Sequence, residues 1–98
     1  MRIDFKSREL YLLYTEERNA HRYPPGVIVN FFEVMTIIAG AANENDIRAM
    51  KSLHFEKLSG ARRRQYSLRL NKQYRLIIQI EKDEFGKLVW IIEIVDYH

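Results

Sequence analysis

The hydrophobic periodicity of this chain changes near its middle, and no other feature restricts its fold as strongly. In the first half, apolar residues recur at helical spacing, as Leu10, Leu13 and Tyr14 do. From Tyr66 onward they alternate with polar residues, as in β-strands. Helices followed by strands are typical of an α+β domain, in which the helices pack on one face of an antiparallel sheet.

Two to three helices are expected in the first half of the chain. Ser7 is positioned to cap a helix that ends near Ala20, and Pro25 suits the first turn of the next helix. Asn45 or Asp46 can cap a short third helix. The second helix carries the longest apolar stripe, which comprises Val27, Phe31, Val34, Met35 and Ile38.

The sheet is expected to combine a short N-terminal strand at residues 3–5 with a three-stranded C-terminal meander. The meander strands are predicted at residues 66–71, 74–80 and 88–97, because apolar residues alternate or run continuously there. Residues 71–73 form the first turn of the meander.

Arg69 and Arg75 flank this predicted turn on adjacent strands. Side chains alternate between the two faces of a strand, so both arginines are expected on the face away from the helices. The sequence therefore predicts a basic sheet surface.

The chain is predicted to form a single domain over residues 1–98, since 47% of its residues are apolar and can form one core. It has no cysteine, which excludes disulfides and thiolate metal sites. No apolar stretch approaches the roughly 20 residues of a membrane span, and the N-terminal residues do not resemble a signal peptide. A cytoplasmic protein without membrane contacts is expected.

Basic residues are concentrated in the middle of the chain. Residues 45–75 contain nine bases and two acids, a charge of +7. The remainder contains seven bases and eleven acids, a charge of −4, and the two parts give the net charge of +3. Such a segment favours binding of a polyanion such as nucleic acid. A basic face that contacts only solvent is the alternative interpretation.

The polar residues of this segment and of the C-terminus suit RNA cleavage. When the ribose 2′-OH attacks the adjacent phosphate, the reaction needs a base, cations for the developing charge and an acid for the leaving oxygen. The histidines lack metal-ligand spacing and no glycine-rich nucleotide loop is present, so neither a metal nor a cofactor is expected. The candidate residues are His54, Lys57, Arg62, Arg63, Arg64, Arg69, Arg75, Asp96, Tyr97 and His98.

Several candidates also have ordinary structural explanations. His54 can interact with carbonyl groups at the end of a short helix, and the three consecutive arginines can form a solvated loop. Tyr97 can pack in the core. His98 is harder to explain in purely structural terms, because it lies directly after a predicted strand, where disorder usually begins.

Five motifs follow one another between residues 50 and 98: Leu53-His54, Lys57-Leu58-Ser59-Gly60, Tyr66-Ser67-Leu68-Arg69-Leu70-Asn71, Tyr74-Arg75-Leu76 and Ile94-Val95-Asp96-Tyr97-His98. This set resembles the HigB-type toxins of the RelE/ParE toxin–antitoxin superfamily. The resemblance implies a RelE-like fold, cleavage of mRNA on translating ribosomes and inhibition of translation. It also implies neutralisation by a helix-turn-helix antitoxin of the HigA type, with operator DNA bound only through the antitoxin complex.

Carried onto matching positions, the resemblance implies particular roles. Lys57 and Arg75 are expected to stabilise the phosphorane, and His98, oriented by Asp96 or aided by His54, is expected to act as base or acid. The division of these roles stays open. Tyr97 is expected to stack on a base or orient the scissile phosphate. The expected RNA contacts outside this group are Arg62, Arg63, Arg64, Arg69 and Lys72.

One loop departs from the pattern of many relatives, which carry Gly-Asp-Arg and a further glycine before the sheet motif. This chain has Gly60-Ala61-Arg62-Arg63-Arg64 there, which leaves its codon preference open while favouring RNA binding. Two rival functions also remain: a toxin that poisons DNA gyrase on the same fold, and a non-catalytic RNA-binding module.

Overall fold

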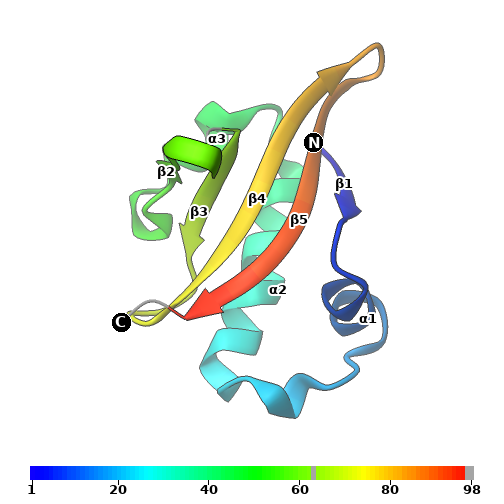
Figure 1. Ribbon diagram of the computed structural model, residues 1–98, viewed down its shortest axis with the longest axis vertical. Helices are drawn as coiled ribbons and strands as arrows, with labels where there is room; N and C mark the ends of the chain where they lie inside the picture. Colours follow the sequence, from blue (N-terminus) through cyan, green and yellow to red (C-terminus); the bar gives the residue numbers. More distant parts are fainter. Residues whose placement is uncertain (63, 97–98) are drawn as a thin grey trace.

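A β-sheet forms the centre of the molecule (Figure 1). The computed structural model describes residues 1–62 and 64–96. Within these residues, five strands follow the spatial order β1-β5-β4-β3-β2. The strands are β1 (Arg2–Phe5), β2 (Glu56–Lys57), β3 (Gln65–Arg69), β4 (Tyr74–Asp83) and β5 (Gly86–Asp96).

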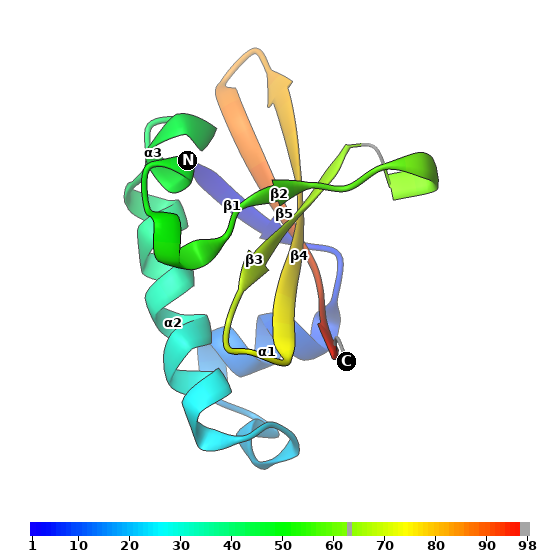
Figure 2. The same ribbon diagram turned by 90° about the vertical axis from the view of Figure 1, so that its left-hand side faces the viewer.

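Helices cover one face of this sheet. Figure 2 shows α2 and α3 on one side of the sheet and the short turn η3 projecting on the other. The predicted α+β class, with two to three helices on one face, is confirmed. In the described residues the α-helices and 3-10 turns are α1 (Arg8–Glu16), η1 (Ala20–Arg22), α2 (Pro25–Gly40), α3 (Glu44–Arg48), η2 (Lys51–Leu53) and η3 (Gly60–Arg62).

The ends of α1 show how local sequence sets helix length. Ser7 caps the helix as predicted, because its Oγ accepts a hydrogen bond of 3.1 Å from the Leu10 amide. The helix ends at Glu16, earlier than predicted, since Glu17 and Asn19 both adopt the left-handed conformation (φ 51° and 64°). The chain then turns through η1 and begins α2.

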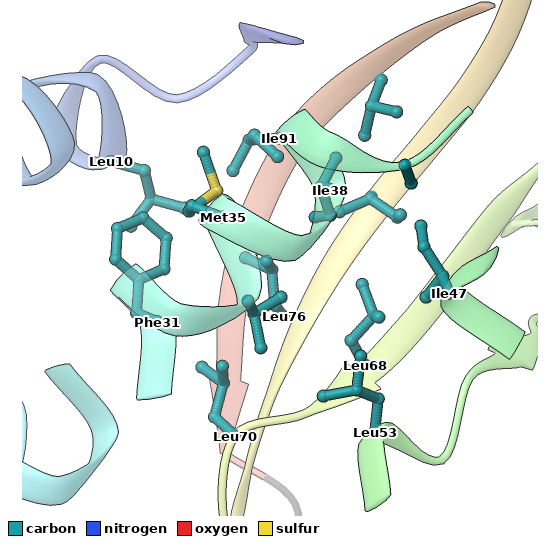
Figure 3. Packing of buried hydrophobic residues seen from close by; sticks show 14 of the residues in the cluster. Leu10, Phe31, Met35, Ile38, Ile47, Leu53, Leu68, Leu70, Leu76 and Ile91 are labelled. Atoms are coloured by element: carbon teal, nitrogen blue, oxygen red, sulfur yellow. The ribbon is translucent and has the colours of Figure 1, made fainter. Parts of the chain in front are cut away.

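The apolar stripe of α2 packs against the sheet (Figure 3). Phe31, Met35 and Ile38 are fully buried and belong to one cluster with Leu68 of β3 and Leu76 of β4. Burying a side chain of this size contributes about 1.5–3 kcal/mol relative to leaving it exposed. The predicted stripe therefore holds the sheet against the helices.

The register of the β3–β4 hairpin separates apolar from basic side chains, as the sequence predicts. Leu68 pairs with Leu76, and Arg69 pairs with Arg75. Since side chains alternate, the two leucines face the helices and the two arginines face the other side. We call that other side the distal face; by register it includes Arg69, Arg75, Ile77 and Glu93.

Two features of the sheet differ from the expectation. β1 runs parallel to β5, with Ile3 beside Val89, so the sheet is mixed and not entirely antiparallel. Alternation predicts a strand but carries no information about its direction. β2 was not expected at all; it pairs antiparallel with β3. Among the described residues, no helix is both long enough and apolar enough to cross a bilayer.

Candidate functional site

His54 meets two arginines at the end of the β3–β4 hairpin that carries its turn. It directly follows η2 and has a left-handed backbone (φ 45°). Nη2 of Arg75 donates a hydrogen bond of 2.7 Å to the His54 carbonyl oxygen. Nη1 of Arg69 lies 3.1 Å from Nε2 of the His54 ring. The hairpin thus positions both the backbone and the imidazole of one exposed histidine.

The contact with Arg69 is compatible with one tautomer of neutral His54. A guanidinium group has only donors, so Nε2 must be the acceptor in this pair. In the neutral imidazole the proton then lies on Nδ1, and Nε2 carries the lone pair. The arrangement places a proton acceptor directly beside two permanent cations.

The turn between β3 and β4 brings the end of β5 to the same place. Asn71 Oδ1 accepts hydrogen bonds from the amides of Gln73, at 2.8 Å, and Tyr74, at 2.6 Å, which fixes the turn. Nε2 of Gln73 in turn donates to Oδ2 of Asp96 at 3.0 Å. Asp96 is therefore held at the hairpin end that carries Arg69 and Arg75, and exposed Lys72 lies in the same turn.

The remaining candidates divide into three groups. Arg62 lies on the distal face, where its Nη2 is 2.9 Å from Oε1 of Glu93. Arg64 and Lys57 line a separate concavity at the β2 edge of the sheet. Arg63, Tyr97 and His98 lie outside the described residues.

Lys57 is not brought together with Arg75, although the resemblance implies that both contact one phosphate. Lys57 pairs with Tyr66, and Glu56 pairs with Ser67. Tyr66 packs against the helix-side core, so Lys57 shares that side of the sheet, while Arg75 belongs to the distal face.

Two further residues around the site carry no signal in the sequence pattern. Gln73 orients Asp96, and Glu93 pairs with Arg62. Both roles depend on strand register, although the turn that holds Gln73 was predicted. A cavity of about 300 Å³ also adjoins the site, and its lining includes Arg69, Asn30 and Glu33.

Comparison with a solved structure shows that the chain has the fold of the RelE-like toxins. The whole chain matches the whole of a YoeB/ParE toxin from Agrobacterium tumefaciens with a TM-score of 0.60 at 11% identity, so the two share a fold. This fold bears out the predicted RelE-like architecture.

Sequence comparison then gives the family. A family model described as the RelE-like toxin of the type II toxin–antitoxin system HigB matches residues 3–98. Toxin HigB-1 of Vibrio cholerae is 38% identical over 80 residues, which cover 81% of this chain and 83% of that protein. An uncharacterised protein of Haemophilus influenzae is 30% identical over 84 residues, covering 86% and 83% of the two chains. The chain belongs to the HigB-like toxin family, as the sequence motifs predict, and so has an antitoxin as partner.

Proposed function

We propose that this toxin is a ribosome-dependent mRNA endoribonuclease, in which the ribose 2′-OH attacks the neighbouring phosphate without help from a metal ion. The observation that carries the proposal is the contact between the His54 imidazole and Arg69, beside Arg75, on an exposed sheet end. RNA contains its own nucleophile, so the protein has to supply only proton transfer and charge stabilisation.

The first step begins when an RNA phosphate reaches the arginines. A phosphate is a stronger, charged acceptor for a guanidinium group than a neutral imidazole, so Arg69 exchanges the ring for the phosphate. This exchange releases Nε2 of His54, which takes the proton of the 2′-OH as the oxygen attacks phosphorus. His54 is therefore assigned as the general base.

The second step breaks the bond between phosphorus and the 5′-oxygen. Arg69 and Arg75 stabilise the charge of the phosphorane, and an acid protonates the leaving oxygen. We assign this acid to His98, oriented by Asp96, with Tyr97 stacked on a base. The products are a 2′,3′-cyclic phosphate and a 5′-hydroxyl end.

The same proposal specifies the partners. The toxin acts in the cytoplasm on mRNA held in the ribosome, and ribosomal RNA contacts its basic surface. Its antitoxin is a helix-turn-helix protein of the HigA type, and operator DNA is bound through the antitoxin complex only. Cleavage of mRNA would account for inhibition of translation.

The test is to add purified toxin to ribosomes translating a defined mRNA and to map the new ends. We expect cuts at fixed positions, with fragments whose 5′-hydroxyl ends polynucleotide kinase labels directly. Ends that need phosphatase before labelling would point to hydrolysis by water and contradict the proposed chemistry.

Two other outcomes would support the rival functions. DNA breaks trapped on gyrase, with intact mRNA, would indicate a gyrase poison. Ribosome binding without any cleavage, unaffected by replacement of His54 and His98 together, would indicate a non-catalytic RNA-binding module.

A further inference from the structure

A second basic surface lies at the β2 edge of the sheet, apart from the His54 site. It is a concavity of about 500 Å³ that we call the Lys57 concavity. Tyr66 and Ile80, which contribute to it, pack against the helix-side core, so it does not belong to the distal face. Its lining comprises Lys57, Arg64, Tyr66, Ile80, Glu81 and Lys82.

The charge of this concavity is unbalanced. Lys57, Arg64 and Lys82 are all exposed, and among the described residues none of them forms an ion pair. Glu81 contributes the only carboxylate of the lining. Three cations against one carboxylate around one hollow favour an anionic ligand.

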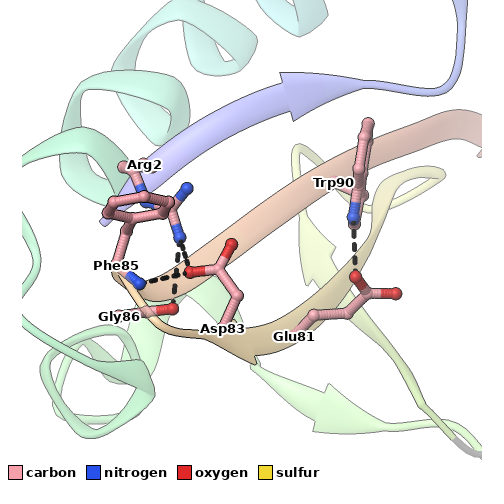
Figure 4. A network of polar contacts seen from close by, with 6 residues as sticks. All are labelled: Arg2, Glu81, Asp83, Phe85, Gly86 and Trp90. Carbon is pink, nitrogen blue, oxygen red and sulfur yellow. Dashed lines mark hydrogen bonds and ion pairs between the residues drawn. The ribbon is translucent and has the colours of Figure 1, made fainter.

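Glu81 forms no ion pair with these cations among the described residues, and its carboxylate accepts hydrogen bonds from two neutral side chains. Its Oε1 accepts a hydrogen bond of 2.8 Å from Gln79. Its Oε2 accepts one of 3.1 Å from the indole of Trp90, which Figure 4 shows. Gln79 and Trp90 pair in register on the distal face. These hydrogen bonds orient the carboxylate, and three cations against this one carboxylate leave the lining with a net positive charge.

The lining of the concavity includes the aromatic residue Tyr66, which packs on a second ring. The Tyr66 ring stacks on Phe55, with centroids 4.7 Å apart and ring planes at 14°. The guanidinium group of Arg48 lies 5.3 Å from the centroid of Phe55. An aromatic side chain in the same lining as cations matches a nucleotide, whose phosphate contacts the cations and whose sugar or base contacts the ring.

We propose that the Lys57 concavity binds a backbone phosphate of RNA, separate from the scissile phosphate at His54. This proposal rests on the proposed function, because it assumes that the ligand of the toxin is RNA. Arg62 and Arg64 support it, since they lie two residues apart and reach opposite sides of the sheet. An RNA strand can therefore pass from the concavity around the β2 edge to the distal face.

The experiment measures binding separately from cleavage. The probe is a fluorescent 2′-O-methyl RNA oligonucleotide, which cannot be cleaved because its 2′-oxygen is blocked. The test variant is Lys57→Gln with Lys82→Gln, and the control is Arg8→Gln with Arg18→Gln, which removes one exposed charge at the start of α1 and one just after its end. Affinity is measured by fluorescence anisotropy over a range of salt concentrations, and affinity for vacant ribosomes by co-sedimentation.

We expect the test variant to bind about tenfold more weakly. The slope of the logarithm of affinity against the logarithm of salt concentration should become shallower by about 0.7, for the lost phosphate contact. Weaker binding of the oligonucleotide assigns the phosphate to the substrate strand. If binding of ribosomes weakens while binding of the oligonucleotide does not, the phosphate belongs to ribosomal RNA. If neither affinity changes more than in the control, the proposal is wrong.

Two comparisons keep the result interpretable. Thermal melting reports whether the double variant folds, and Arg64→Gln alone replaces it if it does not. Failure of the proposed function is recognised separately, since a toxin that makes no cuts but loses RNA affinity in the test variant would still have an RNA site here.

Discussion

Arg69 and Arg75 lie directly opposite each other in the β3–β4 hairpin, and both contact His54. Arg75 binds the backbone carbonyl of His54, and Arg69 binds its ring. His54 is exposed and has a positive φ of 45°, a conformation that is unfavourable for a residue with a side chain. The two arginines therefore supply charge to the proposed reaction and also hold the proposed base in place.

Replacing His54 with glutamine tests its role as general base. Glutamine still accepts a hydrogen bond from Arg69 but cannot take a proton. We expect cleavage on translating ribosomes to fall by about 10²–10⁴-fold with ribosome binding retained. The control is His21→Gln, an exposed histidine in η1. A full cleavage rate in His54→Gln would remove this residue from the chemistry.

The Arg75→Lys variant keeps the positive charge but loses the planar fork of the guanidinium group. A lysine at this place cannot bind the His54 carbonyl and a phosphate with the geometry of arginine. We expect cleavage to fall by about 10²-fold or more, as for the loss of one donor to a developing charge. Arg18→Lys, at an exposed position just after α1, is the matched control. If the Arg75→Lys variant cleaves mRNA at the normal rate, a single positive charge is enough for the reaction and the planar guanidinium group is not required.

Replacing His98 with alanine tests the proposed acid. His98 follows Asp96 by two residues, and Asp96 is held at the hairpin end that carries Arg69 and Arg75. We expect cleavage to fall sharply while the fold and the ribosome affinity stay unchanged. Circular dichroism and co-sedimentation check these two controls. Undiminished cleavage would refute the assigned role.

The pairing of Arg69 with Arg75 was predictable because it depends on two local signals. The alternating pattern assigns each side chain to a face, and the short turn at Asn71 fixes which residues are opposite. Residue type identifies His54 and Asp96 as candidates, but their contacts with the hairpin result from tertiary structure.

The position of Lys57 in the sheet could not be predicted from the sequence. Its strand, β2, has two residues, both charged, so no hydrophobic alternation marks it. The face on which Lys57 lies depends on the pairing of β2 with Tyr66 and Ser67, and a shift by one residue would reverse it. The direction of β1 was similarly unpredictable, because β1 contacts a strand more than 80 residues away, as the pairing of Ile3 with Val89 shows.

The Leu76→Ala variant tests the core on which the hairpin rests. Leu76 is completely buried below the distal face, next to Arg75 in the chain. Truncating a buried leucine to alanine costs about 2–5 kcal/mol of unfolding free energy. Urea denaturation should show this loss, whereas Val29→Ala, at a side chain that is 58% exposed, should change little. A loss below about 1 kcal/mol would mean that the site is less tightly packed than the burial indicates.

The ionisation of Tyr23 should make the free energy of unfolding depend on pH in the alkaline range. Burial raises the pKa of the Tyr23 hydroxyl above its ordinary value of 10.0, and the negative charge of Glu9 raises it further. The folded state therefore retains this proton more strongly than the unfolded state does. The resulting stability is fully present below pH 10 and is lost as pH rises through the higher pKa of the folded protein. Urea unfolding from about pH 8 to 11 should show a steeper loss in the wild type than in Tyr23→Phe, which has no proton to lose there. Parallel pH profiles of the two proteins would show that Tyr23 does not contribute to alkaline unfolding.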